Sequence, residues 1–243
     1  MSRSIWIGFD PREFAAYAVA RNSIRRRMLR ETPIKGVILS HLRVDGLYKR
    51  STSVRDGLLW DDISDAPMAT EFACSRFLVP HLAKRMPRQT QAERWALFMD
   101  CDMLVRGNIY DLFSACDPSK AVMVVKHNHN PTEAIKMDGQ IQTRYARKNW
   151  SSVMAFNLEH PANDALTVDL VNTVPGRDLH RFCWLNDDDI GALDPGWNYL
   201  VGNSPQHPNP GIVHFTDGIP TMEGYEDCEF ADEWRAELAD CAR

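Results

Sequence analysis

Short apolar runs alternate with an amphipathic stretch in the first forty residues. Residues 4–10, SIWIGFD, form an apolar run that predicts a β-strand ending at Asp10. Pro11 suits the first turn of a helix, and the apolar residues after it recur at helical spacings of three and four: Phe14, Tyr17, Ala20, Ile24 and Met28. A second apolar run at 34–40 is rich in β-branched residues. Strand, helix and strand open a βαβ unit, so the pattern predicts an α/β fold with a mostly parallel sheet.

Further elements of both kinds are expected along the rest of the chain. Residues 45–65 are polar and irregular and predict a loop, whereas 70–86 predict a helix that Pro80 kinks or interrupts. Apolar runs predict strands at four places: 95–99, 120–127, 151–158 and 211–215. Helical patterns occupy three stretches, the first of them capped by Asn108: 108–116, 162–174 and 232–243.

The segment 127–149 is polar and has few apolar anchors. A connection of that length inside a compact domain is usually functional or disordered. No internal repeat or low-complexity linker divides the chain, so residues 1–243 are expected to form a single domain, with about 220–243 as a C-terminal helical extension.

Two aspartates, Asp100 and Asp102, interrupt the apolar run WALFMDCDMLV. In open α/β sheets ligands bind beyond the carboxyl ends of the strands, which is where this pair falls. Two carboxylates spaced one residue apart can converge on one hard divalent cation, and such a cation neutralises a departing diphosphate. The alternative is a strand-end turn in which both side chains make local backbone bonds. Because apolar residues resume at Met103, the run favours the metal site over a plain turn.

A second set of polar residues follows later apolar segments. His214 ends the run GIVH, where it is either a satisfied structural histidine or a ligand that would favour a manganese-like ion beside two carboxylates. Three carboxylates, at 187–189 in NDDDIG, precede an expected helix. They are either favourable charges at a helix N-terminus, or a cluster of like charges that is stabilised by a cation or by hydrogen bonds from sugar hydroxyl groups.

Composition excludes several classes of function. The chain has 28 basic and 33 acidic residues and a net charge of −5, which argues against non-specific nucleic-acid binding. Motifs of the G-x-S-x-G, P-loop and G-x-G-x-x-G types are absent, so hydrolase-triad and dinucleotide-binding functions lack support. The basic cluster at 25–30 has helical spacing and is expected to form a solvated helix face.

The expected compartment is the cytoplasm, with at most peripheral membrane contact. No apolar run approaches the roughly 18 residues of a membrane span, and the sequence opens on a strand-like segment rather than an apolar leader. Six cysteines without a C-x-x-C pair fit reduced thiols.

Four segments, in order, resemble the GT-A glycosyltransferases, and specifically glycosyltransferase family 8, the glycogenin and lipopolysaccharide-galactosyltransferase group. Residues 72–82, FACSRFLVPHL, resemble the family's arginine-bearing helix, and 95–113 resemble its D-x-D strand and following helix. NWSSVMAFNLEHP at 149–161 is similar to the family's FNSGVMLIN strand, and GIVHFTDG at 211–218 to its late histidine strand. This likeness spans most of residues 1–220 and implies a GT-A (Rossmann-like) fold, with a mixed, mostly parallel sheet flanked by helices.

The resemblance implies a role for each matching residue. Asp100, Asp102 and His214 would bind Mn²⁺ or Mg²⁺ on the diphosphate of a nucleotide sugar, expected to be UDP-linked. Arg76 would contact the donor sugar or its phosphate. Further donor contacts are expected at the end of the first strand, between the aspartates and in the matched segments: Gly8, Phe9, Asp10, Cys101, Ser151, Ser152 and Gly218.

The acidic run resembles the family's DQD segment, with Asp188 where the family commonly has glutamine. The resemblance therefore implies that Asp187 or Asp188 is catalytic, stabilising positive charge on the transferred sugar or acting as a nucleophile. It also implies retention of the anomeric configuration.

Two departures from the family bear on the substrates. Trp150, Ser151 and Ser152 replace its NSG triplet, and the lysine expected after the histidine strand is missing. Lys126, Arg144 and Arg147 are candidates to replace that lysine. Acceptor contacts are expected in and beside the polar segment, where the two aromatic residues would stack on sugar rings: Lys126, His127, Arg144, Tyr145 and Trp150.

The expected function is transfer of a hexose-type sugar from a nucleotide-diphosphate donor to a glycan, glycolipid or other glycoconjugate. Two alternatives stay open. One is a nucleotide-sugar or glycan-binding module without turnover, which the missing lysine favours. The other is a haloacid-dehalogenase-like phosphatase, which the position of the aspartate pair in the middle of the chain disfavours.

Overall fold

A six-stranded sheet in the order β10-β8-β9-β6-β1-β2 forms the centre of the computed structural model, which describes residues 2–87, 94–127 and 147–241. Its strands are β1 (Ser2–Phe9), β2 (Ile34–Ile38), β6 (Arg94–Met99), β8 (Val122–Val124), β9 (Val153–Asn157) and β10 (Ile190–Ala192). β1 runs parallel to β2 and β6, and β10 runs parallel to β8, whereas β9 is antiparallel to both β6 and β8. The expected mixed, mostly parallel sheet is confirmed.

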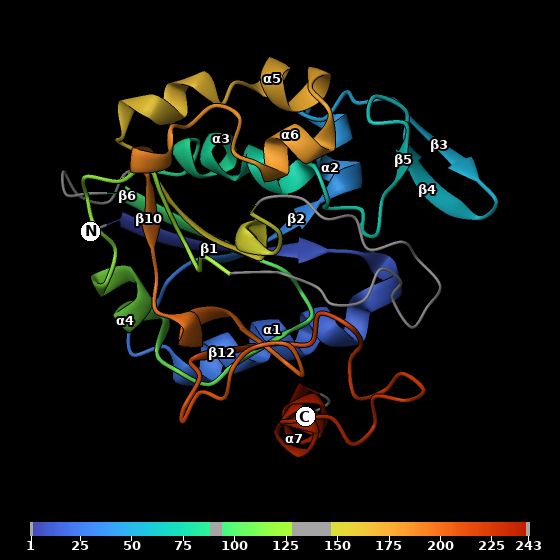
Figure 1. Ribbon diagram of the computed structural model, residues 1–243, viewed down its shortest axis with the longest axis vertical. Helices are drawn as coiled ribbons and strands as arrows, with labels where there is room; N and C mark the ends of the chain where they lie inside the picture. Colours follow the sequence, from blue (N-terminus) through green and yellow to red (C-terminus); the bar gives the residue numbers. More distant parts are fainter. Residues whose placement is uncertain (1, 88–93, 128–146, 242–243) are drawn as a thin grey trace.

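Helices and a smaller sheet cover the two faces of this sheet (Figure 1). On one side lie α1 (Phe14–Arg27), α7 (Ala231–Cys241) and the three-stranded sheet β11-β12-β7, made of Tyr199–Leu200, Ile212–His214 and Met103–Val105. On the other lie α3 (Val79–Lys84), α5 (Val168–Thr173) and α6 (Gly176–His180). Because both faces are covered, every residue of β6 is buried. Two shorter helices, α2 (Leu39–Val44) and α4 (Ile109–Ser114), follow β2 and β7, and Asn108 caps α4 as expected.

The expected loop at 45–65 is wrong, because this segment contributes a small antiparallel sheet. β3 (Thr52–Arg55), β4 (Leu58–Asp61) and β5 (Ala66–Pro67) pair in that order and lie to one side of the main sheet (Figure 1). Asp56 and Gly57 join β3 to β4 with φ of 49° and 79°. Asp-Gly suits a two-residue turn that needs positive φ at both positions, and this signal was available in the sequence.

Two expected long helices are broken into shorter pieces. In 70–86, a 3-10 helix at Ser75–Leu78 precedes α3, and Pro80 lies in the first turn of α3, where its missing N–H is tolerated. In 162–174, a 3-10 helix at Pro161–Ala165 precedes α5, whose first turn is capped by the Thr167 side chain. The interruption expected near Pro80 is confirmed, whereas the prediction for 162–174 was wrong because it treated the start of α5 as part of a continuous helix.

The remaining elements are short. Pro11–Glu13, Trp150–Ser152, Asp187–Asp189 and Pro195–Asn198 are 3-10 helices. The helix expected after the acidic run is wrong, because Ile190–Ala192 instead adds strand β10 to the edge of the sheet. Most of the polar segment 127–149 lies outside the described residues.

The basic cluster on α1 faces α7. Arg26 pairs with Asp240, and Arg27 Nη1 lies 3.1 Å from Glu237 Oε2. Glu237 is buried, and its Oε1 also accepts a 2.8 Å hydrogen bond from Asn22 Nδ2. Part of the predicted solvated face is therefore a helix–helix contact. Among the described helices, none has the length and apolarity needed to cross a bilayer.

Candidate functional site

The aspartate pair lies where the chain leaves the main sheet for the smaller one. Asp100 follows β6 directly, and Asp102 precedes β7, which pairs antiparallel with β12. In that register Met103 is opposite His214, and Phe215 N donates a 2.9 Å hydrogen bond to Asp102 O. The strand pairing therefore brings His214 to the aspartates, although more than a hundred residues separate them in sequence.

Asp100, Asp102 and His214 each present one ligand atom, and these atoms all lie within 4.8 Å of one another. We call these three residues the triad. His214 Nε2 is 3.3 Å from Asp102 Oδ1, and the His214 side chain is 3% exposed. Burial lowers the pKa of His214, but the two aspartates outweigh it and raise the pKa overall. Burial, reinforced by Asp102, raises the pKa of Asp100 against the opposing effect of Arg76.

The triad fits a divalent cation. Asp100 Oδ1 and Asp102 Oδ1 are buried, and neither accepts a well-aligned hydrogen bond from the described part of the chain. Each has only an ion-pair contact, to Arg76 and His214 respectively. Two carboxylates with one imidazole form a donor set that suits a manganese-like ion, and a cation would bind the two oxygens that the described residues leave without hydrogen bonds.

Arg76 is held rigidly beside the triad. Its Nη1 lies 2.7 Å from Asp100 Oδ1 and donates a 3.0 Å hydrogen bond to Ser151 O. The guanidinium also lies 5.2 Å from the ring centre of Phe72 and 5.0 Å from that of Phe98. This arginine is therefore a fixed positive charge at the edge of the sheet, which is where the sequence placed a phosphate or sugar contact.

Asn198 is a residue of the site that the sequence did not indicate. It is fully buried, and its Oδ1 accepts a 3.0 Å hydrogen bond from His214 Nδ1. Its Nδ2 donates to Ser152 Oγ at 2.8 Å and to Asn149 O at 3.3 Å, and since a carbonyl can only accept, the amide orientation is determined. The Nδ1–H of neutral His214 therefore faces Asn198, and its Nε2 lone pair faces the aspartates. The sequence gives no signal for this contact, because it forms only when the Pro195–Asn198 helix packs beside β12 in the folded chain.

Several residues predicted to contact the donor also have local structural roles, and their contact with a donor stays a prediction. A Cβ on Gly8 would lie 2.5 Å from the Phe72 ring, and one on Gly218 would lie 2.4 Å from the Tyr225 ring, so both glycines permit close packing. Asp10 is buried and accepts hydrogen bonds from the backbone of Arg12 and Glu71. Burial raises the pKa of Asp10, but hydrogen bonds from the Arg12 side chain and from these two backbone groups outweigh it and lower the pKa overall.

The other predicted donor residues also have protein partners. Phe9 packs edge-on against Tyr17 at a ring-centre distance of 5.1 Å. The Cys101 thiol points to Glu13, donating to Oε2 at 2.9 Å, and its burial raises the pKa of the thiol. Ser151 Oγ is 2.7 Å from His180 Nδ1, and the Ser152 hydroxyl donates to Asn149 O.

The acidic run at 187–189 precedes β10, at the edge of the main sheet. Through the register of β10, β8, β9 and β6, Ile190 is level with Ala96. Asp189 is accordingly level with Trp95, five residues short of Asp100, or about 16 Å along the strands at about 3.3 Å per residue. The run precedes β10, whereas Asp187 pairs with Arg147, whose guanidinium lies 5.8 Å from the ring centre of Trp150. A catalytic role for Asp187 or Asp188 therefore stays a prediction.

Local contacts occupy the acidic run. Asp187 pairs with Arg147, and Asp188 O accepts a 2.9 Å hydrogen bond from Lys120 Nζ. Asp189 Oδ2 accepts a 3.1 Å hydrogen bond from Asn186 N, which caps the 3-10 helix. The run forms a 3-10 turn before strand β10, so the alternative of favourable charges at the start of a following helix is wrong.

Three of the predicted acceptor residues lie together at the triad edge. Trp150 Nε1 donates a 3.1 Å hydrogen bond to His127 O, and Lys126 Nζ lies 5.6 Å from the Trp150 ring centre. Arg144 and Tyr145 lie outside the described residues.

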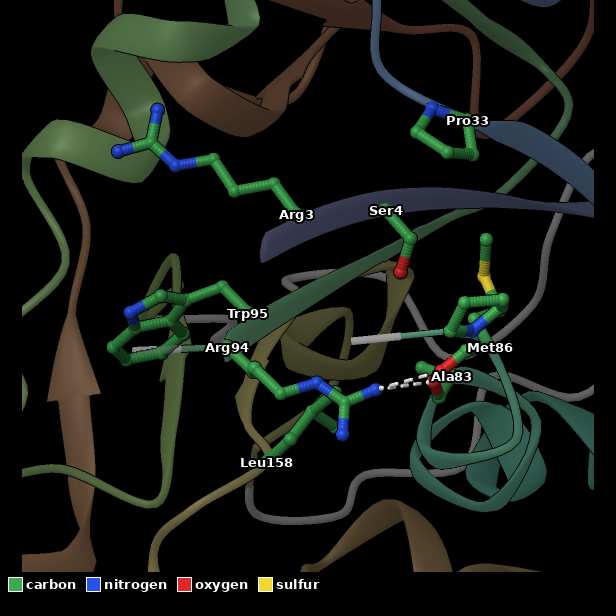
Figure 2. A pocket seen from close by; sticks show the side chains of 9 residues that line it. Arg3, Ser4, Pro33, Ala83, Met86, Arg94, Trp95 and Leu158 are labelled. Atoms are coloured by element: carbon green, nitrogen blue, oxygen red, sulfur yellow. Dashed lines mark hydrogen bonds between the residues drawn. The ribbon is translucent and has the colours of Figure 1, made fainter. Parts of the chain in front are cut away.

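A small cavity of about 20 Å³ lies near the start of β1 and β6, at the opposite edge from the triad. Figure 2 shows Arg94 Nη2 donating to Ala83 O, at 2.8 Å, while the Arg3 guanidinium points away from Arg94. Arg94 Nε is buried without a hydrogen-bond partner in the described structure. The volume is about that of one water molecule, so this cavity fits a buried water rather than a substrate.

No family model matches the chain. Protein CDI of Arabidopsis thaliana is 41% identical over 239 residues, which are 96% of this chain and 85% of that protein. The galactosyltransferase LgtC, solved with donor and acceptor sugar analogues, aligns with a TM-score of 0.56 at 14% identity over 98% of this chain and 95% of LgtC.

Two further solved structures share the architecture. Mouse xyloside xylosyltransferase 1 aligns with a TM-score of 0.52 at 15% identity over 89% of this chain and 98% of that chain. The bifunctional glycosyltransferase WbbM aligns with a TM-score of 0.55 at 15% identity over 98% of this chain, which spans half (50%) of the WbbM chain. At these identities the likeness establishes the fold alone, and that fold is GT-A.

Proposed function

This chain belongs to the family of Arabidopsis Protein CDI and has the GT-A fold, and from that premise we propose that it is a metal-dependent glycosyltransferase. The donor is a nucleotide-diphosphate sugar and the acceptor a carbohydrate or glycoconjugate. The observation that carries the proposal is the triad at the carboxyl end of β6, with two buried carboxylate oxygens that lack hydrogen bonds and a fixed arginine beside them.

Each residue of the site has a distinct part. Asp100, Asp102 and His214 would hold a divalent cation, which when bound supplies positive charge against the developing charge of the departing diphosphate. Arg76 adds a second positive charge that cannot be lost by deprotonation. Its contacts with Ser151 O and two aromatic rings fix it in place, so little reorganisation is needed as the negative charge develops.

The finer features of the reaction are part of the same proposal. A UDP-linked hexose donor, manganese as the metal and retention of the anomeric configuration are supported by the sequence resemblance to glycosyltransferase family 8. Manganese is further supported by the mixed carboxylate and imidazole set. The same resemblance supports a catalytic role for Asp187 or Asp188, and Asp187 pairs with Arg147, whose guanidinium lies near the Trp150 ring.

A screen of nucleotide sugars by thermal shift, with and without Mn²⁺, tests the proposal directly. A ligand that binds the native state alone raises the unfolding midpoint, so one nucleotide sugar should raise it only when the metal is present. Transfer or hydrolysis of the isotopically labelled sugar, followed by NMR of the anomeric proton, then reports turnover and configuration. Metal-dependent binding without turnover would instead make the chain a binding module, and phosphate release from simple monoesters would make it a phosphatase.

A further inference from the structure

A cavity of about 400 Å³ opens between the end of β8 and the segment that follows β11. We call it the hollow; its walls are residues 125–127, Pro195 and residues in 199–207. Its volume falls within the usual range for ligand pockets.

The hollow adjoins the triad. Leu200, in one wall, is the β-sheet partner of His214, and Val201 N donates a 3.0 Å hydrogen bond to His214 O. In the other wall, His127 O accepts the hydrogen bond from Trp150, two residues before the Ser152 that binds Asn198. Hydrogen bonds and strand pairing therefore connect both walls to the residues that support the triad. A molecule in the hollow would lie beside a donor bound at the triad.

The lining of the hollow combines apolar surface with hydrogen-bonding groups. Tyr199, Leu200 and Pro205 supply apolar surface. The polar side chains include amides, a hydroxyl group, imidazoles and an ammonium group: Lys126, His127, Asn203, Ser204, Gln206 and His207. This mixture suits a sugar, which carries hydroxyl groups around apolar C–H faces.

The described lining of the hollow is poorer in acidic side chains than the chain as a whole. Among the described residues that line the hollow there is no aspartate or glutamate, although acidic residues outnumber basic ones by 33 to 28 in the chain. Lys126 is exposed, its ammonium lies over the Trp150 ring, and it takes part in no ion pair with a described carboxylate. A positive charge that no described carboxylate neutralises favours a negatively charged partner.

We propose that the hollow receives the acceptor of the transfer, and that this acceptor is an acidic glycan whose carboxylate or phosphate group binds Lys126. The inference rests on the proposed function and narrows its acceptor class. In this proposal Lys126 binds the acceptor rather than the diphosphate of the donor.

The test uses pairs of probes that differ in charge. Trigalacturonate is compared with its fully methyl-esterified form, and glucose 6-phosphate with glucose, so that the two pairs separate carboxylate from phosphate recognition. Each is titrated into the full chain with UDP and Mg²⁺ present, and binding is followed by the ¹⁵N resonance of the Trp150 indole, assigned with Trp150→Phe. We expect at least one acidic probe to bind about tenfold more tightly than its neutral partner, as for one charge-assisted contact.

Three variants locate the effect. Lys126→Gln removes the ammonium, and Gln206→Glu places a carboxylate in the hollow at an exposed position with nearly unchanged shape. Each should abolish the tenfold preference while changing UDP affinity by less than about twofold. Lys120→Gln, just before β8 at the opposite edge of the sheet, is the matched control and should keep the preference.

Two results would overturn the inference: equal binding of the acidic and neutral probes, or a loss of UDP affinity in Lys126→Gln that equals its loss of probe affinity. The second would assign Lys126 to the donor diphosphate. A wild-type chain that binds UDP but shows no charge preference refutes this inference alone. A chain that binds no nucleotide at any metal concentration refutes the proposed function, and a charge preference measured without UDP would then show an acidic-glycan site on its own.

Discussion

Asn198 Oδ1 lies 3.0 Å from His214 Nδ1, and this contact orients the one imidazole of the triad. Since Asn198 Nδ2 also donates to Ser152 Oγ, and Asp100 N donates a 3.0 Å hydrogen bond to Ser152 O, one buried amide joins β12 to the turn that carries the aspartates. Asn198 is a positioning residue, acting on the metal through His214.

Replacing Asn198 should weaken metal binding without removing a ligand. Asn198→Leu leaves His214 Nδ1 without an acceptor and should lower Mn²⁺ affinity by about 10–100-fold, as is typical for outer-shell partners of metal ligands. Asn198→Asp keeps an acceptor oxygen for His214 and should retain most of the affinity. Calorimetric titration with Mn²⁺ compares the two, and ¹⁵N NMR of the imidazole reports its tautomer. Equal losses in both variants would show that the contact with Ser152, rather than His214, matters.

Asp102→Asn should abolish metal-dependent nucleotide binding and leave the fold intact. The variant replaces an anionic ligand with a weak amide ligand, so the loss of Mn²⁺ affinity should exceed the roughly 100-fold expected for an outer-shell change. Calorimetry with UDP and Mn²⁺ measures the loss, and circular dichroism checks the fold. Asp217→Asn, three residues beyond His214 and exposed, is the matched control. Unchanged metal-dependent binding in Asp102→Asn would remove the triad from the proposed site.

The ion pair between Arg50 and Asp61 should be the most sensitive point of the β3–β5 sheet. Both residues are almost fully buried, with Arg50 Nε 3.0 Å from Asp61 Oδ1, and Arg50 Nη1 donates to Val171 O and Val174 O at 2.7 Å. Breaking such a pair leaves an uncompensated buried charge, so Asp61→Asn should lower the free energy of unfolding by about 3–5 kcal/mol. Urea denaturation measures this loss.

Arg55→Gln, in the exposed pairs with Asp62 and Asp65, is the control for that measurement and should leave the urea midpoint unchanged. A similar shift in both variants would mean that the sheet is stabilised by overall charge rather than by the buried pair.

His180 should make the protein less stable as the pH falls. Burial, with a smaller contribution from Arg76, lowers the pKa of His180 to about 3 from an ordinary value of 6.5. Between these values the unfolded chain binds a proton that the folded chain does not, so this contribution is complete above pH 6.5 and is lost as the pH falls toward 3.

The expected slope is up to about 1.4 kcal/mol per pH unit for this one group. His180→Gln, which retains a hydrogen-bonding side chain for Ser151, should lose less stability than the wild type between pH 6 and pH 5 when both are unfolded with urea. Parallel losses would show that His180 titrates equally in the folded and unfolded states.

The local pattern of the sequence determined most of the central fold. The apolar runs of β1, β2, β6, β8, β9 and β12 were sufficient to predict strands, because strands covered on both faces need apolar side chains throughout. Short elements were missed where one or two residues determine the local structure. Examples are the Asp56–Gly57 turn of the hairpin and Thr167 at the start of α5.

The resemblance predicted that Asp100, Asp102 and His214 share a site, but only the tertiary structure shows how these residues come together. The spacing of Asp100 and Asp102 is local and could be read from the sequence, whereas the pairing of β12 with β7 brings His214 to them. Asn198 has no local signal at all, since its role depends on a hydrogen bond to a residue sixteen positions later in the chain. Strand order and direction set these distances, because they result from packing of the whole core rather than from the residues at the site.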